Sequence, residues 1–304
     1  MSTGEGHINR ITFLIPYYRG IEYLDSAIRS LIAQSNPHWR AIVIDDRGGE
    51  DAEDFVRQID DERLSYVRNE MNLGLAKNWN KAMSLADSEF ATIFHSDDEL
   101  EPNYTDVMLS LMDRHPDAFA GHCRTNVIGP DGQKITSLPD LVKTAIRPHS
   151  NHDSVLVGAE GLLSITKGAW IFCPTLCYRR AMFPTTGFDD SWKFALDVDL
   201  MAKVLFSGGT IVGTSEVAYR YRRHLQNQTA ILTESTLRFE EELRHLDEVA
   251  DRASHLGWEK VARTARRRTV VRLHLTYQAI RALFHLKVKR ATSLFVLALR
   301  GQPK

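Results

Sequence analysis

The chain has 304 residues, of which 43% are hydrophobic and 25% charged, with a formal net charge of −1. This is the composition of a globular protein with one large domain, or one domain with an appendage. No apolar run approaches the length of a membrane span, no secretory leader opens the chain, and three cysteines without a Cys-x-x-Cys pair argue against a disulfide framework or a zinc site. We therefore expect a cytoplasmic protein.

Residues 10–100 alternate short apolar runs with helical patterns. The apolar runs predict strands at 11–15, 41–44, 64–67 and 90–94, and apolar residues at helical spacing predict helices at 21–34, 50–60 and 75–86. Four strands that alternate with three helices predict an α/β fold with a wound, mostly parallel sheet flanked by helices.

Polar side chains follow each of these predicted strands. They are Tyr17 and Tyr18, then Asp45 and Asp46, then Arg68 and Asn72, then the run His95-Ser96-Asp97-Asp98. Because the carboxyl ends of parallel strands share one edge of a sheet, we expect these groups to form one pocket. Its aromatic, amide and carboxylate groups suit a nucleoside diphosphate whose phosphates meet a divalent cation. The plainer alternative is that Asp97 or Asp98 caps the helix that Pro102 helps to start.

The region 101–230 is less regular. We predict a strand at 119–128, a long polar loop at 133–157, a strand at 174–179, a helix at 192–206, and short strands at 211–212 and 217–221. Asp197 and Asp199 lie near the start of this apolar helix, where a carboxylate either answers the helix dipole or has a raised pKa suited to base chemistry. A basic patch follows, and such patches contact phosphate or are simply solvated: Arg220, Arg222, Arg223 and His224.

From about Thr233 the chain is predicted to be wholly helical. One amphipathic helix covers 237–256, and a second apolar stripe runs through 261–300. Residues 260–304 carry twelve Lys or Arg and no Asp or Glu, which leaves 26 basic and 39 acidic residues in the body before them. Such a tail suits an anionic membrane surface, packing on the acidic body, or a second subunit. Nucleic acid is not an expected partner, because the cations lack an aromatic stacking pattern.

In their order along the chain, these blocks resemble glycosyltransferase family 2, a group of inverting enzymes with the GT-A fold that use nucleotide sugars. The resemblance covers about residues 10–230 and implies a GT-A domain over 1–230, with its nucleotide part at about 10–100 and its acceptor part at about 101–230, before a helical extension at 231–304. The matching segments are Ile15-Pro16-Tyr17-Tyr18, Val43-Ile44-Asp45-Asp46, residues 68–80, His95-Ser96-Asp97, Gly187-Phe188-Asp189, Leu196-Asp197-Val198-Asp199-Leu200 and Tyr221-Arg222-Arg223-His224.

The resemblance implies a role for individual residues. Asp197 is the expected general base, and Asp97 and His224 are the expected ligands of Mn²⁺ or Mg²⁺. We assign Trp170, Thr175 and Asp98 to the acceptor. The residues expected to bind the nucleotide are Pro16, Tyr17, Tyr18, Asp46, Arg68, Asn72, Gly74, Asn78 and Ser96.

The implied reaction moves a sugar from a nucleotide-diphosphate sugar, with a UDP-sugar favoured, to a hydroxyl of a glycan or lipid-linked precursor. Peripheral contact with the inner membrane leaflet and a homodimer are the expectations for the basic tail. The sequence departs from the family pattern at four places, which bear on the donor sugar more than on the reaction: Arg19 after Tyr18, Arg47-Gly48 after Asp46, His95 in place of an aspartate, and Leu196 in place of a glutamate.

Two other classes of protein remain open. A sugar nucleotidyltransferase shares the wound sheet, but it needs a glycine-rich basic loop after the first strand, which Pro16-Tyr17-Tyr18-Arg19-Gly20 does not resemble. A non-catalytic nucleotide-sugar-binding protein would keep the pocket and could lose Asp197. No Gly-x-Gly-x-x-Gly follows the first strand and no P-loop motif occurs, so neither a dinucleotide dehydrogenase nor a P-loop enzyme is supported.

Overall fold

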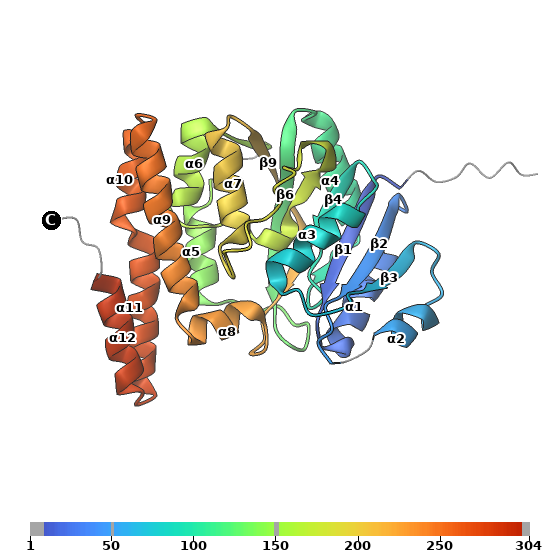
Figure 1. Ribbon diagram of the computed structural model, residues 1–304, viewed down its shortest axis with the longest axis horizontal. Helices are drawn as coiled ribbons and strands as arrows, with labels where there is room; N and C mark the ends of the chain where they lie inside the picture. Colours follow the sequence, from blue (N-terminus) through green and yellow to red (C-terminus); the bar gives the residue numbers. More distant parts are fainter. Residues whose placement is uncertain (1–8, 50–51, 149–151, 300–304) are drawn as a thin grey trace, which may run out of the picture.

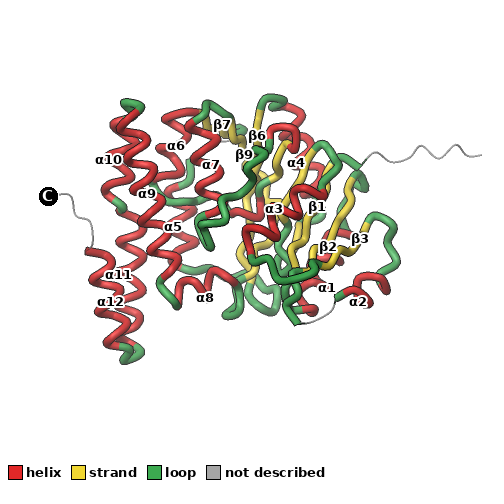
Figure 2. Tube along the Cα trace, viewed as in Figure 1, coloured by secondary structure: helices red, strands yellow, loops and turns green. Residues whose placement is uncertain are grey.

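The computed structural model describes residues 9–49, 52–148 and 152–299. Within these residues the chain forms one mixed sheet of nine strands with helices on both faces. Figure 1 shows a stack of helices from the last quarter of the chain at the end of the molecule opposite the first strands. Figure 2 shows the same division, with the strands gathered in one part and helices alone at the far end. The predicted α/β fold with a C-terminal helical stretch is therefore confirmed.

The first part of the sheet consists of four parallel strands. They are β1 (Ile11–Tyr17), β2 (Trp39–Asp45), β3 (Leu64–Arg68) and β4 (Phe90–Ile93), connected by α1 (Ile21–Ile32), α2 (Glu53–Gln58) and α3 (Leu75–Leu85). Strand β1 pairs in parallel with both β2 and β4, and β2 pairs with β3. All seven predicted elements are present with shifts at their ends; the first residues of the predicted helix 50–60 lie outside the described part.

Strand β1 is buried on both faces, and its alternate side chains divide between two layers of the core. Leu14 packs with the α3 side of the sheet, in the same cluster as Trp79. Phe13 and Ile15 pack with the α1 side, in the same cluster as Leu24. A parallel strand covered by helices on both faces needs such a continuous apolar run, which is why the sequence signal was clear here.

The second part of the sheet is mixed. It contains β5 (Glu99–Leu100), β6 (Ala118–Ile128), β7 (Ser154–Val157), β8 (Cys177–Arg179) and β9 (Thr210–Arg222), with helices α4 (Tyr104–Arg114), α5 (Leu138–Ile146), α6 (Gly158–Thr166) and α7 (Leu196–Phe206) and the 3-10 turns η1 (Cys173–Thr175) and η2 (Arg180–Met182). The strand order is β3-β2-β1-β4-β8-β6-β9-β5, and β7 pairs with β9. Strand β8 is antiparallel to both neighbours, whereas β6 and β9 are parallel.

Three predictions in this part were wrong. The segment 133–157 is not a single loop, since it contains α5 and β7, although residues 149–151 lie outside the described part. Pro139, which indicated a loop, lies in the first turn of α5, where proline is tolerated. The predicted strands 211–212 and 217–221 are one strand, β9, whose register against β6 shifts between them. The predicted strand at 174–179 begins as the turn η1 and becomes a strand only at Cys177.

The C-terminal part is helical as predicted, but the second predicted apolar stripe, through 261–300, is divided among separate helices. The helices are α8 (Gln228–Glu234), α9 (Leu237–His255), α10 (Glu259–Arg267), α11 (Thr269–Phe284) and α12 (Val288–Leu299). Arg268 and Leu286 take left-handed backbone conformations, with φ of 53° and 57°, and they end α10 and separate α11 from α12. Helices α9 and α10 contribute to the main core, whereas α11 and α12 form a smaller cluster with the start of α9. The domain boundary at 230 stays a prediction.

Among the described helices, none combines the length and the apolar character that crossing a bilayer requires.

Candidate active site

The loops after β1 and β2 touch each other at the carboxyl edge of the sheet. Tyr17 is in register with Asp45, and Asp45 is in register with Arg68 of β3. A Cβ atom on Gly48 would lie 1.5 Å from the carbonyl oxygen of Tyr18, so only glycine allows this approach of backbone to backbone. The Tyr18 side chain itself is 48% exposed, which leaves its ring available at the edge.

Asp46 organises the loop between β3 and α3. Its buried carboxylate accepts hydrogen bonds from the Asn69 side-chain amide at 2.7 Å and from the backbone N–H groups of Leu73 at 2.8 Å and Gly74 at 2.9 Å. The Asn72 side chain donates to the carbonyl oxygen of Asp46 at 2.8 Å. Asn69 also donates to Asn78 at 2.9 Å. Several residues predicted to bind the nucleotide therefore lie together in this loop, where Asp46 forms hydrogen bonds with both Asn72 and Gly74.

The run after β4 places three potential metal ligands together. His95, Asp97 and Asp98 offer ligand atoms that all lie within 4.8 Å of one another. Asp97 Oδ2 lies 2.9 Å from His224 Nε2, which comes from the segment after β9. His95 Nε2 is buried, and within the described part of the chain it has no hydrogen-bond partner.

This donor set fits a hard divalent cation. Two ligands that each lie about 2.1 Å from an octahedral Mg²⁺ at a right angle are about 3 Å apart, close to the Asp97–His224 separation. Carboxylate and imidazole suit Mn²⁺ equally well. Asp98 is the poorer candidate, because Tyr219 Oη donates to its Oδ2 at 3.0 Å and the backbone N–H of Arg222 donates to its Oδ1 at 2.7 Å. Burial and the nearby charge of Asp97 raise the pKa of Asp98.

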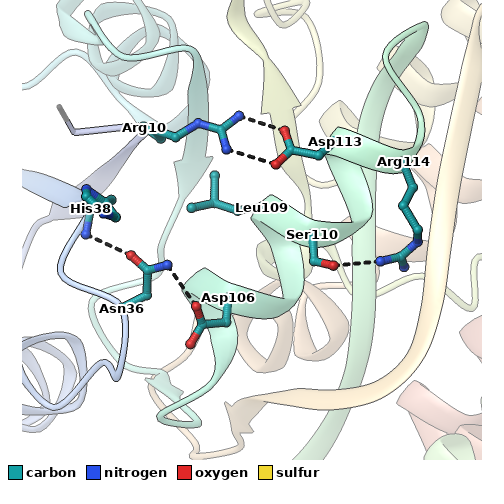
Figure 3. Close-up of a pocket in the computed structure, with 8 residues that line it drawn as sticks. All are labelled: Arg10, Asn36, His38, Asp106, Leu109, Ser110, Asp113 and Arg114. Atoms are coloured by element: carbon teal, nitrogen blue, oxygen red, sulfur yellow. Dashed lines mark hydrogen bonds and ion pairs between the residues drawn. The ribbon is translucent and has the colours of Figure 1, made fainter.

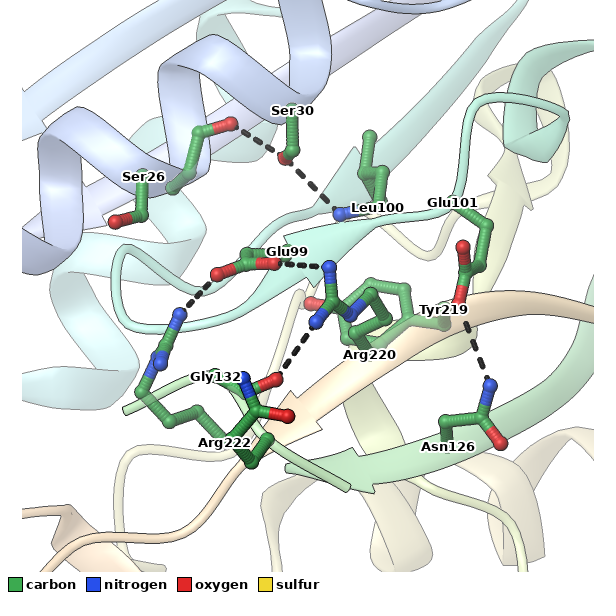
Figure 4. Close-up of polar contacts among 12 residues, drawn as sticks. Ser26, Ser30, Glu99, Leu100, Glu101, Asn126, Gly132, Tyr219, Arg220 and Arg222 are labelled. Atoms are coloured by element: carbon green, nitrogen blue, oxygen red, sulfur yellow. Dashed lines mark hydrogen bonds and ion pairs between the residues drawn. The ribbon is translucent and has the colours of Figure 1, made fainter. Parts of the chain in front are cut away.

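Arg222, which is buried, holds this run against β9. Its Nε donates to the carbonyl oxygen of Asp97 at 2.8 Å, and its Nη1 donates to the carbonyl oxygens of Gly129 at 3.1 Å and Pro130 at 3.0 Å. Glu99 lies between the guanidinium groups of Arg220 and Arg222 and pairs with both (Figure 4). Each member of this buried network therefore has partners.

Asp197 lies in the first turn of α7 and is partly exposed. Burial raises the pKa of its carboxyl group, while a backbone N–H bond, the charge of Lys143 and the thiol of Cys173 oppose that rise. Burial and the charges of Arg238 and Arg223 lower the pKa of Lys143 to about 8. Burial and the charges of Asp197 and Asp98 raise the pKa of the Cys173 thiol. Cys173 in η1 is therefore within electrostatic range of two carboxylates, Asp98 in the run after β4 and Asp197 at the start of α7.

Helix α7 is fixed at its N-terminus by Glu241 of α9. The Glu241 carboxylate accepts hydrogen bonds from the backbone N–H groups of Lys193 at 2.9 Å, Phe194 at 2.7 Å and Ala195 at 3.1 Å. The predicted helix 192–206 begins four residues late, at Leu196, and the carboxylate of Glu241 meets the N–H groups just before it. Sequence reasoning missed Glu241, Cys173 and Lys143. Glu241 lies in an ordinary amphipathic helix and carries no motif.

The turn that precedes α7 is held against α3. Asn80 donates to the carbonyl oxygen of Phe188 at 2.8 Å, and the backbone N–H of Phe188 donates to Asn80 Oδ1 at 2.7 Å. Gly187 has a φ of +65°, and a Cβ atom there would lie 2.3 Å from Asn80 Oδ1. The Gly-Phe-Asp turn therefore depends on glycine for both its conformation and its space.

The three residues assigned to the acceptor are buried. Asp98 and Thr175 have no exposed surface, and Trp170 is 3% exposed. Asp98 is held by Tyr219 and Arg222, and Thr175 Oγ1 donates to the carbonyl oxygen of Phe172 at 2.7 Å. Asp98 and Thr175, whose side chains have no exposed surface, would reach an acceptor only through neighbouring residues, and the assignment of the three residues to the acceptor stays a prediction.

A separate hollow of about 630 Å³ lies at the opposite edge of the sheet. Arg10 and His38 precede β1 and β2, and the other lining residues belong mainly to α4 (Figure 3). Its charged groups are already paired, since Arg10 pairs with both Glu89 and Asp113. This hollow is wide and open, and it is remote from the strand-end groups described above.

Comparison with known proteins finds one family and several relatives. Residues 12–181 match the family described as "Glycosyl transferase family 2". TuaG of Bacillus subtilis, named for a glycosyltransferase of teichuronic acid biosynthesis, is 30% identical over 112 residues, which are 36% of this chain and 44% of TuaG. The Escherichia coli UDP-Glc:alpha-D-GlcNAc-diphosphoundecaprenol beta-1,3-glucosyltransferase WfgD is 26% identical over 102 residues, which are 34% of this chain and 40% of WfgD. The chain thus spans less than half the length of both relatives.

A solved structure has the same fold. The mannosyltransferase PcManGT from Pyrobaculum calidifontis, in complex with GDP-Man and Mn²⁺, gives a TM-score of 0.63 at 15% identity, over 97% of this chain and 88% of that protein. This likeness confirms the predicted GT-A type of fold.

Replacing Glu241 with Gln should lower the free energy of unfolding by about 1–3 kcal/mol, because a charged acceptor of several backbone N–H groups is lost inside the protein. Urea denaturation followed by circular dichroism measures this loss. The matched control is Glu240→Gln, an exposed neighbour on α9 that bonds only to Thr236. We expect the control to change stability by less than about 0.5 kcal/mol. Equal losses in the two variants would contradict the anchoring role of Glu241.

Proposed function

The chain belongs to glycosyltransferase family 2, and we propose that it transfers a sugar from a nucleotide-diphosphate sugar to an acceptor hydroxyl with inversion at the anomeric carbon. One observation carries the proposal. Asp97 and His224 form a metal-competent pair 2.9 Å apart, and the Cys173 thiol is within electrostatic range both of Asp98, the residue after Asp97, and of Asp197, a carboxylate of raised pKa. A cation site beside a carboxylate base is the minimum that this transfer needs.

The donor would bind along the strand ends. Tyr18 offers an exposed ring for stacking on the base, and the loop organised by Asp46 borders the nucleotide. We keep Pro16, Tyr17, Arg68, Asn72, Gly74, Asn78 and Ser96 as proposed members of this nucleotide site. Mn²⁺ or Mg²⁺ held by Asp97 and His224 would stabilise the negative charge of the departing diphosphate.

Asp197 would act as the base. Its ionised carboxylate accepts the proton of the acceptor hydroxyl while that oxygen forms a bond to the anomeric carbon and the bond from that carbon to the diphosphate oxygen breaks. A single displacement of this kind inverts the anomeric configuration. Because burial raises the pKa of Asp197, the carboxylate holds the proton more firmly than an exposed aspartate would.

We propose a UDP-sugar donor and a glycan or lipid-linked acceptor. The support is the relative WfgD, whose name gives UDP-Glc as donor and a diphosphoundecaprenol-linked acceptor. Such an acceptor lies in a membrane, and we propose that the turn between α11 and α12 contacts the inner leaflet. Phe284 and Leu286 are 83% and 86% exposed there. Lys287 and Arg290, beside this turn, pair with Glu234 of α8.

Replacing Asp197 with Asn should reduce the transfer rate by about 100-fold to 10,000-fold, the usual contribution of a general base. Nucleotide affinity should remain nearly unchanged, because Asp197 does not border the nucleotide. Release of UDP from a panel of UDP-sugars, together with calorimetric UDP binding, measures both. Asp199→Asn on the same helix is the control, since Asp199 pairs with Lys203. In the unsubstituted enzyme, transfer should fall as pH drops through the raised pKa of Asp197. Full turnover by Asp197→Asn would remove this residue from the role.

Replacing Asp97 with Ala should weaken UDP binding in the presence of Mn²⁺ by about tenfold or more and leave binding in EDTA unchanged. The variant should fold, because Arg222 Nε bonds to the Asp97 carbonyl oxygen and not to its side chain. Isothermal titration calorimetry with and without Mn²⁺ tests this, with the exposed Asp190→Ala as the control. Unchanged metal dependence in Asp97→Ala would discard the assignment.

Replacing Phe284 and Leu286 together with Ser should reduce binding to phosphatidylglycerol vesicles by about tenfold or more, since two large apolar side chains leave the bilayer interface. Vesicle flotation measures the bound fraction. The control is Leu256→Ser at the end of α9, where Leu256 is 49% exposed. If the double variant floats as well as the control, the turn does not contact lipid.

A further inference from the structure

A small cavity of about 60 Å³ lies between β6, α5 and the segment before η1. Three basic side chains line it: Arg124 of β6, Lys143 of α5 and Arg147 just after α5. Water needs roughly 10–15 Å³ per site on this measure, so the cavity has room for a small oxyanion but not for a sugar ring.

Acidic side chains only partly offset the three cations of this cavity, since the charges of Asp197 and Asp140 act on Lys143 without forming an ion pair with it in the described part of the chain. Among the described residues, no carboxylate pairs with Arg124, Lys143 or Arg147, whereas the neighbouring Arg223 pairs with Asp140. Asp140 also lines the cavity, and its carboxylate already accepts hydrogen bonds from Arg223 and from the hydroxyl of Ser137. Lys143 Nζ instead lies 4.1 Å from the centre of the Phe172 ring. Burial and the charge of Arg124 lower the pKa of Arg147, as expected for like charges held together.

The cavity wall also contains a buried donor without a partner. Trp170 lines the cavity, is 3% exposed, and its indole Nε1–H has no hydrogen-bond partner among the residues that the structure describes. The ring of His122, another lining residue, packs edge-on against Trp170 at 5.3 Å. An indole N–H can only donate, so leaving it unmet inside the protein has a cost that an oxygen acceptor would remove.

The cavity is next to the base. Phe172 lines it, and the following residue, Cys173, carries a thiol that is within electrostatic range of Asp197. Lys143 connects the cavity to Asp197, since it lines the cavity and its positive charge opposes the rise in the pKa of Asp197. A group held in the cavity would therefore lie beside a hydroxyl positioned at Asp197.

We propose that this cavity binds an oxyanion, a phosphate or a carboxylate, carried by the acceptor. The acceptor would then be an acidic molecule, such as a sugar phosphate, a lipid-linked diphosphate or a glycan that contains an acidic sugar. Arg124, Lys143 and Arg147 supply the positive charge, and Trp170 supplies a directed hydrogen bond. That the anion belongs to the acceptor rests on the proposed function; that the cavity binds an oxyanion does not.

The first experiment tests the cavity alone. Inorganic phosphate and acetate, each compared with chloride at equal ionic strength, are titrated into the UDP-saturated protein while thermal stability is followed. Phosphate or acetate should stabilise the unsubstituted protein, and its apparent Kd should rise at least tenfold in Arg124→Gln/Arg147→Gln. The control Arg263→Gln/Arg267→Gln removes the same charge from exposed positions on α10. Trp170→Phe removes the indole N–H together with the five-membered part of the ring, and it should also weaken binding. Equal affinity in the cavity and control variants would overturn the proposal.

The second experiment tests the acceptor. Once an acceptor with a phosphate or carboxylate is in hand, the KM for it is compared with the KM for its neutral counterpart. The cavity variant should abolish the preference for the acidic form, while hydrolysis of the UDP-sugar without acceptor stays at the rate of the control variant. An unchanged preference overturns the acceptor assignment. Loss of hydrolysis from all variants and from the unsubstituted protein would instead count against the proposed function, so the two failures are distinguishable.

Discussion

The buried guanidinium of Arg222 is the interaction on which the strand-end half of the site depends. A charge inside the protein must meet acceptors on every side, and Arg222 meets Glu99 and the carbonyl oxygens of Asp97, Gly129 and Pro130. Its own backbone N–H fixes Asp98. Because these partners come from the run after β4, from β5 and from the turn after β6, while Arg222 belongs to β9, one side chain ties the segments of Asp97 and His224 together. The site is built on short segments that follow strands.

The half that carries Asp197 is held from the opposite side of the molecule. Glu241 on α9 binds the N-terminus of α7, and Asn80 on α3 binds the turn before it. The first anchor joins the helical extension to the site, and the second joins the nucleotide part to it. Asp197 thus depends on contacts that span the chain from residue 80 to residue 241. The cavity with Arg124, Lys143 and Arg147 lies against this half, between β6, α5 and residues 170–172.

The sequence predicted best where one local pattern decides the structure. Strands β1 to β4 were found because helices on both faces demand unbroken apolar runs. Helix α5 was missed because Pro139 and its largely exposed surface resemble a loop. The breaks at Arg268 and Leu286 were missed because glycine normally marks a left-handed residue, and neither is glycine. At the site, motif positions brought Asp97 and His224 together, but the burial of Asp98, Trp170 and Thr175 is a property of packing. Glu241 bonds to backbone N–H groups 46 to 48 positions away, which no sequence spacing reveals.

The long separation between Glu241 and the helix it anchors has a consequence for synthesis of the chain. The ribosome releases a protein from its N-terminus, and segments fold as they emerge. Residues 193–195 are translated well before α9. Their N–H groups therefore lack the Glu241 carboxylate until the last quarter of the polypeptide has been made. The sheet and the strand-end groups can form early, whereas Asp197 reaches its final position late. A ribosome-bound fragment that ends before residue 241 would therefore hold the strand-end groups without the anchored start of α7.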